Sequence, residues 1–225
     1  MKNIIITGTS RGIGFELAQI FANAGHNVLA ISRKIPDVLE QNKNINCLSI
    51  DLSNDAHLTK IELFLKENWL QVDAIVHNAG SLLLKPFEET TNQDFENIYK
   101  VNVFAVASLT RIVLPYLQNS SHVVTISSMG GIQGSAKFAG LSAYSSSKGA
   151  IITLSELLAE EYKDRGISFN VLALGSVNTE MLQEAFPGYQ APLTAHEMAD
   201  YIYNFTLTGH KFYNGKVLSV ASSTP

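Results

Sequence analysis

The chain has 225 residues, of which 46% are hydrophobic and 16% are charged, and its formal net charge is −4. These proportions are typical of a globular α/β protein and exclude an intrinsically disordered one, and this length is enough for one large core. The negative net charge gives no electrostatic case for a nucleic acid or an anionic membrane as partner. The single cysteine, Cys47, excludes an internal disulfide framework and suits a reducing cytoplasm, which is the expected location.

The beginning of the chain and its overall pattern set further limits. The first apolar run meets Gly8 too early for the apolar stretch of a signal peptide, and no window has the uninterrupted apolar length of a membrane span. We therefore expect a soluble, intracellular protein without a membrane partner. No linker, composition shift or internal repeat divides the sequence, so residues 1–225 are expected to form a single domain.

In the first half of the chain, short apolar runs alternate with longer amphipathic segments, which indicates βαβ units and a parallel sheet. The expected strands are Asn3–Thr7, Asn27–Ser32, Asn46–Ile50 and Asp73–His77. The expected helices are Ile13–Ala24 and Asn54–Asn68. In the second helix, Leu58, Ile61 and Leu65 recur at helical spacing and predict one apolar stripe.

The second half of the chain is expected to contain two long helices and three strands. These helices are Asn92–Leu117 and Ala143–Arg165, and the strands are His122–Ser127, Ile167–Leu174 and Lys216–Val220. The pattern Thr194-Ala195-His196-Glu197 is a capping box that opens a further helix to about Leu207. The predicted fold is a single doubly wound (Rossmann) α/β domain, in which helices flank a mostly parallel seven-stranded sheet.

A glycine-rich segment, Thr7-Gly8-Thr9-Ser10-Arg11-Gly12-Ile13-Gly14, directly follows the first predicted strand. A pyrophosphate that approaches the backbone closely needs a turn without bulky side chains at the start of a helix. Gly8 would allow the tight turn, Gly12 the close approach, and Gly14 the packing of helix against strand. The alternative is a turn without function, and the position after the first strand favours dinucleotide binding.

Tyr144 and Lys148 are one helical turn apart, in the segment Ala143-Tyr144-Ser145-Ser146-Ser147-Lys148. This pair and the Gly-x-x-x-Gly-x-Gly spacing resemble the short-chain dehydrogenase/reductase family, and the resemblance covers nearly the whole chain. Further matching positions follow in the family's order: Asp51, Leu52, Asn78, Ala79, Gly80, Asn102, Ser127, Ser128, Gly175 and Thr179. Such an ordered set is far more specific than any one of its members.

The resemblance implies a site for a nicotinamide dinucleotide. The expected cofactor-binding residues are Gly8, Ser10, Arg11, Gly12, Ile13, Gly14, Arg33, Asp51, Leu52, Asn78, Ala79, Gly80, Tyr144, Lys148, Gly175, Val177 and Thr179. Within this set, Asp51 and Leu52 would flank the adenine, and Thr179 would bond the nicotinamide carboxamide. Asp51 could also cap the helix that starts near Asn54.

The end of the second strand favours NADP(H) over NAD(H). An NAD-preferring site usually carries an acidic residue there, which accepts hydrogen bonds from the ribose hydroxyls. This chain reads Ile31-Ser32-Arg33-Lys34 and has no carboxylate until Asp37. Arg33, together with Arg11 of the glycine loop, could pair with a 2′-phosphate. The alternative is that both are ordinary surface arginines.

The expected catalytic residues are Asn102, Ser128, Tyr144 and Lys148. A free phenol has a pKa of about 10 and is a poor acid–base group at neutral pH, so we expect the Lys148 ammonium to lower the pKa of Tyr144. Tyr144 would then be the proton donor, and Lys148 would also bind the nicotinamide ribose. By resemblance, Ser128 bonds the substrate carbonyl, with Ser127 the weaker candidate. By resemblance too, Asn102 kinks the long helix and holds a water linked to the lysine.

Several positions depart from the family pattern. His77 stands where an asparagine is common, and we expect it to be a structural residue. Leu174 replaces the usual proline before Gly175. The segment Asn178–Pro192, which by resemblance would be the substrate lid, is short. Apolar residues of this lid and of the opposite rim suggest an open, apolar pocket, unless they belong to the core or to an interface: Met181, Leu182, Phe186, Tyr189, Ile132, Phe138 and Leu141.

The favoured hypothesis is an NADPH-dependent reductase of a ketone or aldehyde, or an alcohol dehydrogenase in the reverse direction, without a metal. The alternative is a catalytically silent NADP(H)-binding sensor or scaffold protein. The resemblance makes helices Asn92–Leu117 and Ala143–Arg165 the natural subunit interface, so we expect a homodimer or homotetramer. A monomer whose helices pack only on its own sheet remains the other reading.

Overall fold

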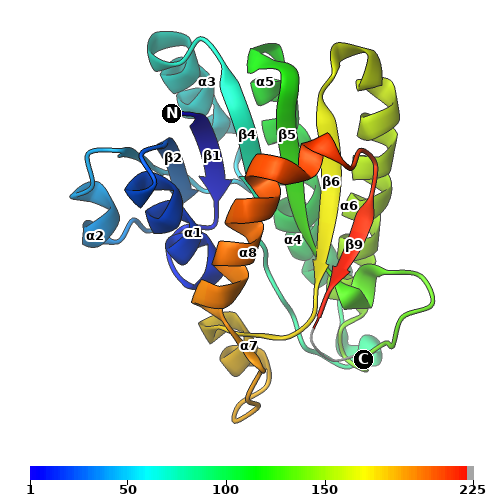
Figure 1. Ribbon diagram of the computed structural model, residues 1–225. Helices are drawn as coiled ribbons and strands as arrows, with labels where there is room; N and C mark the ends of the chain where they lie inside the picture. Colours follow the sequence, from blue (N-terminus) through cyan, green and yellow to red (C-terminus); the bar gives the residue numbers. More distant parts are fainter. Residues whose placement is uncertain (222–225) are drawn as a thin grey trace.

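The computed structural model describes residues 1–221 and forms one seven-stranded, fully parallel sheet in the order β3-β2-β1-β4-β5-β6-β9 (Figure 1). The strands are β1 Asn3–Thr7, β2 Asn27–Ser32, β3 Ile45–Ser49, β4 Val72–His77, β5 Leu117–Ser128, β6 Ser168–Leu174 and β9 Val217–Val220. Two-residue strands β7 (Val177–Asn178) and β8 (Leu193–Thr194) pair separately. The sheet confirms the predicted doubly wound fold.

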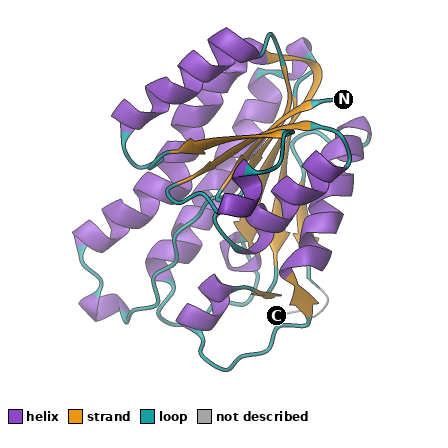
Figure 2. Ribbon diagram, turned by 90° about the vertical axis from the view of Figure 1, so that its left-hand side faces the viewer, coloured by secondary structure: helices purple, strands orange, loops and turns teal. Residues whose placement is uncertain are grey.

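Helices cover both faces of the sheet (Figure 2). The α-helices are α1 Gly12–Asn23, α2 Asp37–Glu40, α3 Asp55–Asn68, α4 Asn92–Tyr99, α5 Ala105–Val113, α6 Ser142–Glu161, α7 Glu180–Ala185 and α8 Ala195–Thr208. Side chains of α1 and α8 pack into one buried apolar cluster, and those of α3, α5 and α6 pack into another. Strands β1, β4 and β6 are buried along almost their whole length because both of their faces are covered.

The predicted helix Asn92–Leu117 ends one residue early and is irregular around Asn102. It consists of α4, a π-helical turn from Lys100 to Phe104, α5, and a 3-10 turn that ends at Tyr116. Leu117 already belongs to β5, which therefore begins five residues before the predicted His122. By length and composition alone, Asn92–Tyr116 could cross a membrane, with a mean hydropathy of 1.3. Buried core helices meet the same criterion, and part of this segment, including Leu109 and Val113, belongs to a buried apolar cluster of the core.

The other boundaries differ from prediction by small amounts. The second long helix ends at Glu161, four residues before the predicted Arg165, and a 3-10 turn completes the segment. The predicted capping box is confirmed, because the Thr194 hydroxyl accepts from the Glu197 N–H while the Glu197 carboxylate accepts from the Thr194 N–H. The short elements α2, α7, β7 and β8 were not predicted, because a single turn or a two-residue strand leaves no periodic pattern.

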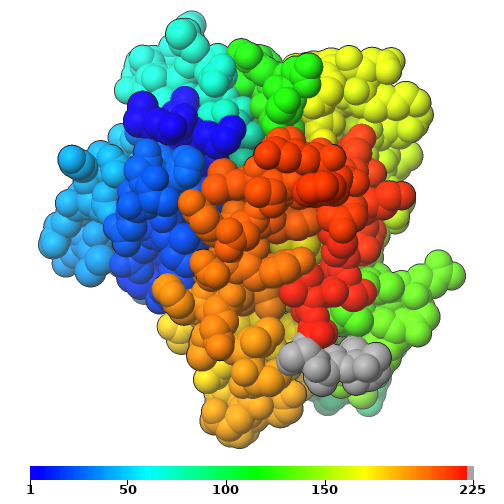
Figure 3. All heavy atoms as spheres, viewed as in Figure 1, coloured from blue at the N-terminus to red at the C-terminus, as the bar shows by residue number. Residues whose placement is uncertain are grey.

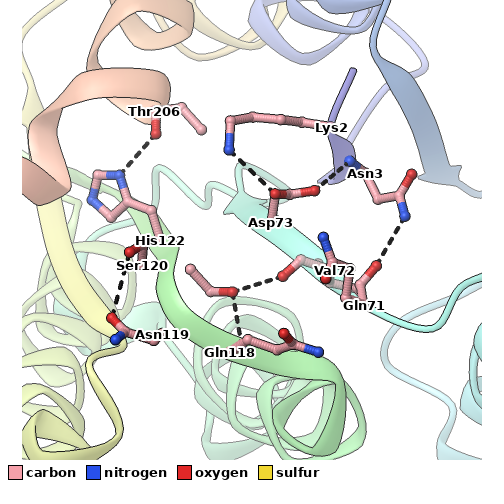
Figure 4. A network of polar contacts seen from close by, with 11 residues as sticks. Lys2, Asn3, Gln71, Val72, Asp73, Gln118, Asn119, Ser120, His122 and Thr206 are labelled. Carbon is pink, nitrogen blue, oxygen red and sulfur yellow. Dashed lines mark hydrogen bonds and ion pairs between the residues drawn. The ribbon is translucent and has the colours of Figure 1, made fainter.

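At the amino edge of the sheet, polar side chains tie neighbouring strands together (Figure 4). The Asp73 carboxylate accepts hydrogen bonds from the backbone N–H of Asn3 at 2.8 Å and from Lys2 Nζ at 3.2 Å. The Ser121 hydroxyl donates to the carbonyl of Val72 at 2.8 Å, beside an irregularity in the β4–β5 register. These contacts join the start of β4 to the start of β1 on one side and to β5 on the other.

His122 extends this edge network into the protein interior. Its Nδ1 lies 3.0 Å from the Thr206 carbonyl, which can only accept, so Nδ1 carries the proton (Figure 4). Its Nε2 accepts from Asn170 Nδ2 at 3.0 Å. The Asn170 amide is itself fixed, because Nδ2 also donates to the Tyr213 carbonyl and Oδ1 accepts from the Lys216 N–H. Burial lowers the pKa of His122 to about 4, so the ring is neutral.

At the carboxyl edge, the strand order reverses. β1 pairs with β2 on one side and β4 on the other, so the chain leaves β1 toward one face and β4 toward the other. In open α/β sheets this switch point leaves a crevice outside the carboxyl ends of the strands, where ligands bind. The functional site is therefore expected here.

Candidate active site

A cleft with a volume of about 680 Å³ runs along the carboxyl edge of the sheet. It extends from the ends of β1, β2 and β3 to the start of α6, and the lid (residues 178–192) borders it. In the space-filling view the lid lies at the same end of the molecule, below α8 (Figure 3). The cleft is long enough to place the glycine loop and the Tyr144–Lys148 pair in one site.

Close backbone contacts form the glycine-loop end of this cleft. Gly8 and Gly12 have positive φ angles of 76° and 59°, which L residues with side chains rarely adopt. A Cβ on Gly8 would lie 2.8 Å from Ala79 Cα, and one on Gly14 would lie 2.3 Å from the Gly8 carbonyl oxygen. The Asn78 amide supports the turn by donating to the carbonyls of Thr7 and Gly8. The loop therefore presents bare backbone at the start of α1.

Nearly all of the predicted site residues line this cleft. The ones that do are Gly8, Ser10, Arg11, Gly12, Ile13, Arg33, Asp51, Leu52, Asn78, Ala79, Gly80, Ser128, Tyr144, Lys148, Gly175, Val177 and Thr179. Two predicted residues, Gly14 and Asn102, lie behind its wall. Ile132 does not line the cleft either, whereas the other six predicted apolar rim residues do.

The predicted alternative cap is wrong: Asn54, not Asp51, caps α3, and the Asp51 carboxylate accepts from Ser53.

Tyr144 and Lys148 lie on the cleft-facing side of α6. Lys148 is 4% exposed, and its Nζ donates to the Ile126 carbonyl at 2.8 Å. The same Nζ is 5.8 Å from the centroid of the Tyr144 ring. A Cβ on Gly80 would lie 3.5 Å from Lys148 Nζ, an ordinary van der Waals contact, so the loop after β4 lies directly beside the lysine.

The pKa directions at this pair differ from the sequence expectation. Burial raises the pKa of the Tyr144 phenol, and a hydrogen bond with Ser128 opposes this only in part. Burial also lowers the pKa of Lys148 to about 8. Lys148 makes no resolved contribution to the Tyr144 pKa here, because its ammonium donates to the Ile126 carbonyl and desolvation dominates, so the expected lowering stays a prediction. The phenol is protonated at neutral pH, as a proton donor must be.

Asn102 lies at the centre of a buried network behind Lys148. It belongs to the π-helical turn between α4 and α5, which confirms the predicted irregularity of the long helix. Its Oδ1 accepts from the Ser81 N–H at 2.8 Å, and its Nδ2 donates to the Ser81 carbonyl at 2.9 Å. Nδ2 also donates to the Ser147 hydroxyl, which in turn donates to the Tyr144 carbonyl at 2.7 Å. Asn102 thus links the loop after β4 to α6, and its predicted water-holding role stays a prediction.

The two serines at the end of β5 have different environments. The Ser127 hydroxyl is buried and donates to the Lys148 carbonyl at 2.8 Å, so it joins the strand to α6. Ser128 is partly exposed in the cleft, where its hydroxyl accepts from the Gly130 N–H at 3.2 Å and can still donate. Ser128 is therefore the serine that can reach a substrate oxygen.

The two arginines at the other end of the cleft also differ. Arg33 is exposed and forms no ion pair within residues 1–221, and its positive charge contributes to the lowered pKa of Asp51. Arg11 is engaged through both terminal nitrogens by the carboxylate of Glu184 on α7, with Nη2 at 2.9 Å from Oε2. Arg11 thus already has a partner within the chain, and its role beside Arg33 at a 2′-phosphate stays a prediction.

His77 is structural, as its sequence position suggested. Its Nε2 lies 3.0 Å from the Thr110 hydroxyl, which itself donates to the Val106 carbonyl and so accepts from the ring N–H. Complete burial lowers the pKa of His77 to about 3. The ring is neutral and takes no part in the cleft.

Sequence reasoning missed several residues of the site. Ser81 and Ser147 anchor Asn102, and Glu184 binds Arg11. Ser147 could have been found from its position, since it lies between Tyr144 and Lys148 on a helix that faces the long helix. Ser81 takes part only through its backbone, and Glu184 pairs across 173 residues, so neither leaves a local signal.

The residues of the cleft fit a dinucleotide. The glycine loop exposes N–H groups at the start of α1, where a side chain would collide with Ala79 or with the Gly8 carbonyl. Arg33 stands at the end of β2, at the opposite end of the cleft from Tyr144. Residues at the ends of β1 to β4 would hold the nucleotide part, and a nicotinamide placed near Tyr144 would supply or accept a hydride.

Comparisons with known proteins identify the family that this chain resembles. A family model described as short chain dehydrogenase matches residues 2–190. The oxidoreductase BOA17 of Botryotinia fuckeliana is 32% identical over 183 residues, which cover 78% of this chain and 65% of that protein. Cyclopentanol dehydrogenase of Comamonas testosteroni is 28% identical over 200 residues, which cover 84% of this chain and 78% of the relative.

Two solved structures extend the likeness to the whole fold. ElxO with NADP bound superimposes with a TM-score of 0.85 at 28% identity and covers 98% of this chain and 97% of its own. The 4-hydroxyisoleucine dehydrogenase complexed with NADH has a TM-score of 0.89 at 21% identity, covers 99% and 98%, and supports the fold alone. The chain belongs to the short-chain dehydrogenase/reductase family. It is thus an oxidoreductase of the class that acts on alcohol and carbonyl groups.

Proposed function

We propose that the protein is an NADPH-dependent reductase of an uncharged, apolar ketone or aldehyde, and the dehydrogenase of the corresponding alcohol in reverse. The observation that carries this proposal is the single cleft that joins Tyr144 and Lys148 at one end to the exposed Arg33 at the other. The absence of a carboxylate at Ser32 and Arg33, where β2 ends, supports NADPH. The NADP-bound ElxO is in line with this choice, although NADH-bound proteins share the fold.

The proposed reaction uses the chain's own groups to manage one proton. When bound, the reduced nicotinamide supplies the hydride that the carbonyl carbon accepts. Tyr144 donates its phenolic proton to the carbonyl oxygen, and Ser128 donates a hydrogen bond to the same oxygen as negative charge develops there. Lys148 adds a positive charge near the phenolate that forms, and Asn102 holds the helix and the loop after β4 in register.

The substrate class follows from the charges of the cleft. The ionisable Asp, Glu, Lys and Arg side chains that line it are Arg11, Arg33, Asp51, Lys148 and Glu180. The arginines and Asp51 lie at the nucleotide end, and Lys148 is buried against β5. The part beside Tyr144 is lined mainly by apolar side chains: Leu82, Met129, Phe138, Leu141, Met181, Leu182, Phe186 and Tyr189. A carboxylate or phosphate on the substrate would meet only the Lys148 ammonium there, which already donates to the Ile126 carbonyl, so we propose an uncharged substrate.

The experiment is a panel of ketones and aldehydes with NADPH, in which the wild type is compared with Tyr144→Phe. The wild type should oxidise NADPH with an apolar ketone, and the variant should turn over about 100- to 10,000-fold more slowly, the range for loss of a general acid. NADPH titration by fluorescence should give similar dissociation constants for both, because the phenyl ring keeps its packing. Full turnover by the variant would refute the proton path, and binding without turnover by the wild type would favour the silent sensor.

We also propose that the protein is a cytoplasmic homodimer or homotetramer. The helices expected at the subunit interface leave Phe104 57% exposed and Leu157 62% exposed. Large apolar side chains so exposed on two adjacent helices are typical of surfaces that another subunit covers. Light scattering should give a mass of two or four chains, and Phe104→Asp should lower it.

A further inference from the structure

The pairing of Arg11 with the lid is a feature that the proposed reaction does not use. Arg11 is the N-cap residue of α1, in the glycine loop, and its side chain makes no cap hydrogen bond to the helix. Instead both terminal nitrogens donate to the two oxygens of Glu184, a bidentate geometry that fixes the guanidinium plane. Hydrogen bonding to Glu184, followed by the charges of Glu184 and Glu180, raises the pKa of Arg11 against the effect of its burial.

The lid meets the glycine loop at this point through further contacts. A Cβ on Gly12 would lie 3.4 Å from Thr179 Cγ2 and 3.6 Å from Glu180 Oε2, so the start of α7 rests directly against the loop. Arg11 borders the dinucleotide cleft and also a second hollow, which Glu184 lines from the other side. The Arg11 guanidinium therefore lies between the dinucleotide cleft and the lid, and it points toward the lid.

We propose that Glu184 is a cofactor-specificity residue, which lowers the preference for NADPH over NADH by engaging Arg11. This inference rests on the proposed function, since it concerns the same dinucleotide site. NADPH carries a 2′-phosphate dianion that gains from a second guanidinium beside Arg33, whereas NADH has a neutral hydroxyl there and gains little. While Glu184 holds Arg11, Arg33 acts alone on the 2′-phosphate. For Arg11 to bind the 2′-phosphate of NADPH as well, the phosphate must displace the Glu184 carboxylate from the guanidinium.

The exposure of the pair sets the size of the effect. The side chains of Arg11 and Glu184 are 45% and 62% exposed, so water and salt screen their attraction. The pairing of Arg11 with Glu184 competes with the binding of Arg11 to the 2′-phosphate. Removing an exposed ion pair of this kind changes such an equilibrium by up to about fivefold. Glu184→Gln should therefore tighten NADPH by about two- to fivefold while it changes NADH by less than about twofold.

The experiment is a fluorescence titration of the full-length protein with NADPH and with NADH, which reports binding without turnover. Glu184→Gln is compared with the wild type and with Glu180→Gln, which removes the same charge from the same helix but no hydrogen bond to Arg11. The ratio of the two dissociation constants should shift toward NADPH in Glu184→Gln and stay within about twofold in Glu180→Gln. Glu184 is exposed, so its variant should unfold at the wild-type temperature.

A second comparison tests whether the effect passes through Arg11. In an Arg11→Ala background, Glu184→Gln should no longer change the ratio, because the guanidinium it restrains is gone. A persisting change there, an equal gain for both dinucleotides, or weaker NADPH binding in Glu184→Gln would each overturn the inference. A wild type that binds neither dinucleotide would instead refute the proposed function, so the two failures are distinguishable.

Discussion

The two edges of the sheet use polar side chains in opposite ways. At the amino edge, Asp73, Ser121 and His122 bond to backbone groups of neighbouring strands or to the end of α8, and they form a closed network. At the carboxyl edge, Ser128 and Arg33 face a cleft and keep hydrogen-bonding capacity for a ligand. Polar side chains thus bond mainly within the fold at the amino edge, and some of those at the carboxyl edge stay available to a ligand. Substitutions at the two edges should therefore affect different measurements.

Ser127 and Ser128 give the closest contrast between a side chain that bonds within the fold and one that faces the cleft, because they are adjacent in β5. Ser128→Ala should lower kcat for carbonyl reduction by about 100-fold, since removing one donor to a developing oxyanion typically costs this much. Ser127→Ala removes only the bond to the Lys148 carbonyl and should lower the free energy of unfolding by about 1 kcal/mol. Steady-state kinetics and urea unfolding of both variants provide the check. Equal losses of kcat would mean that the serine assignment is wrong.

The free energy of unfolding should fall in acid because of His122 at the amino edge. His122 has a folded-state pKa of about 4, below the ordinary value near 6.5, so the folded state favours the neutral ring. The resulting stability is fully present above pH 6.5 and is lost progressively as the pH falls toward 4. At pH 5 the loss from this residue is about 2 kcal/mol, which is 1.5 pH units at about 1.4 kcal/mol each.

Urea unfolding at pH 7 and pH 5 measures this loss. The wild type should lose about 2 kcal/mol more of its free energy of unfolding than His122→Gln does between these two pH values. His77 stays in both proteins, so its own titration cancels in the comparison. Parallel pH dependence in the two proteins would show that His122 is not buried in its neutral form.

The fold and the catalytic end could be predicted from the sequence because their signals are local. The strands are continuous apolar runs, and the glycines and the Tyr144–Lys148 pair have fixed spacings that only certain structures satisfy. The irregularity at Asn102 was also expected, and that expectation came from the family resemblance.

The features that escaped prediction depend on contacts between distant parts of the chain. β5 starts early, at Leu117, because this residue pairs with β4, and the pairing overrides the helical pattern of the preceding residues. The raised pKa of Tyr144 comes from burial, and burial depends on how α6 seats against the sheet. Glu184 is an ordinary surface glutamate by sequence, and only the folded lid brings it to Arg11.

The smallest of these effects is expected at the exposed nucleotide end of the carboxyl edge. Arg33→Ala should weaken NADPH binding by about tenfold, because it removes one charge-assisted contact with the 2′-phosphate in a solvent-exposed place. NADH binding should change by less than about twofold, since its ribose hydroxyl does not need a cation. Lys34→Ala is the matched control, because it removes the neighbouring positive charge from outside the cleft. Isothermal titration of each variant with both dinucleotides measures these affinities. Equal losses of affinity for NADPH and NADH in Arg33→Ala would mean that this arginine does not select the cofactor. The same change of affinity in Lys34→Ala would mean that Arg33 acts only through the net charge.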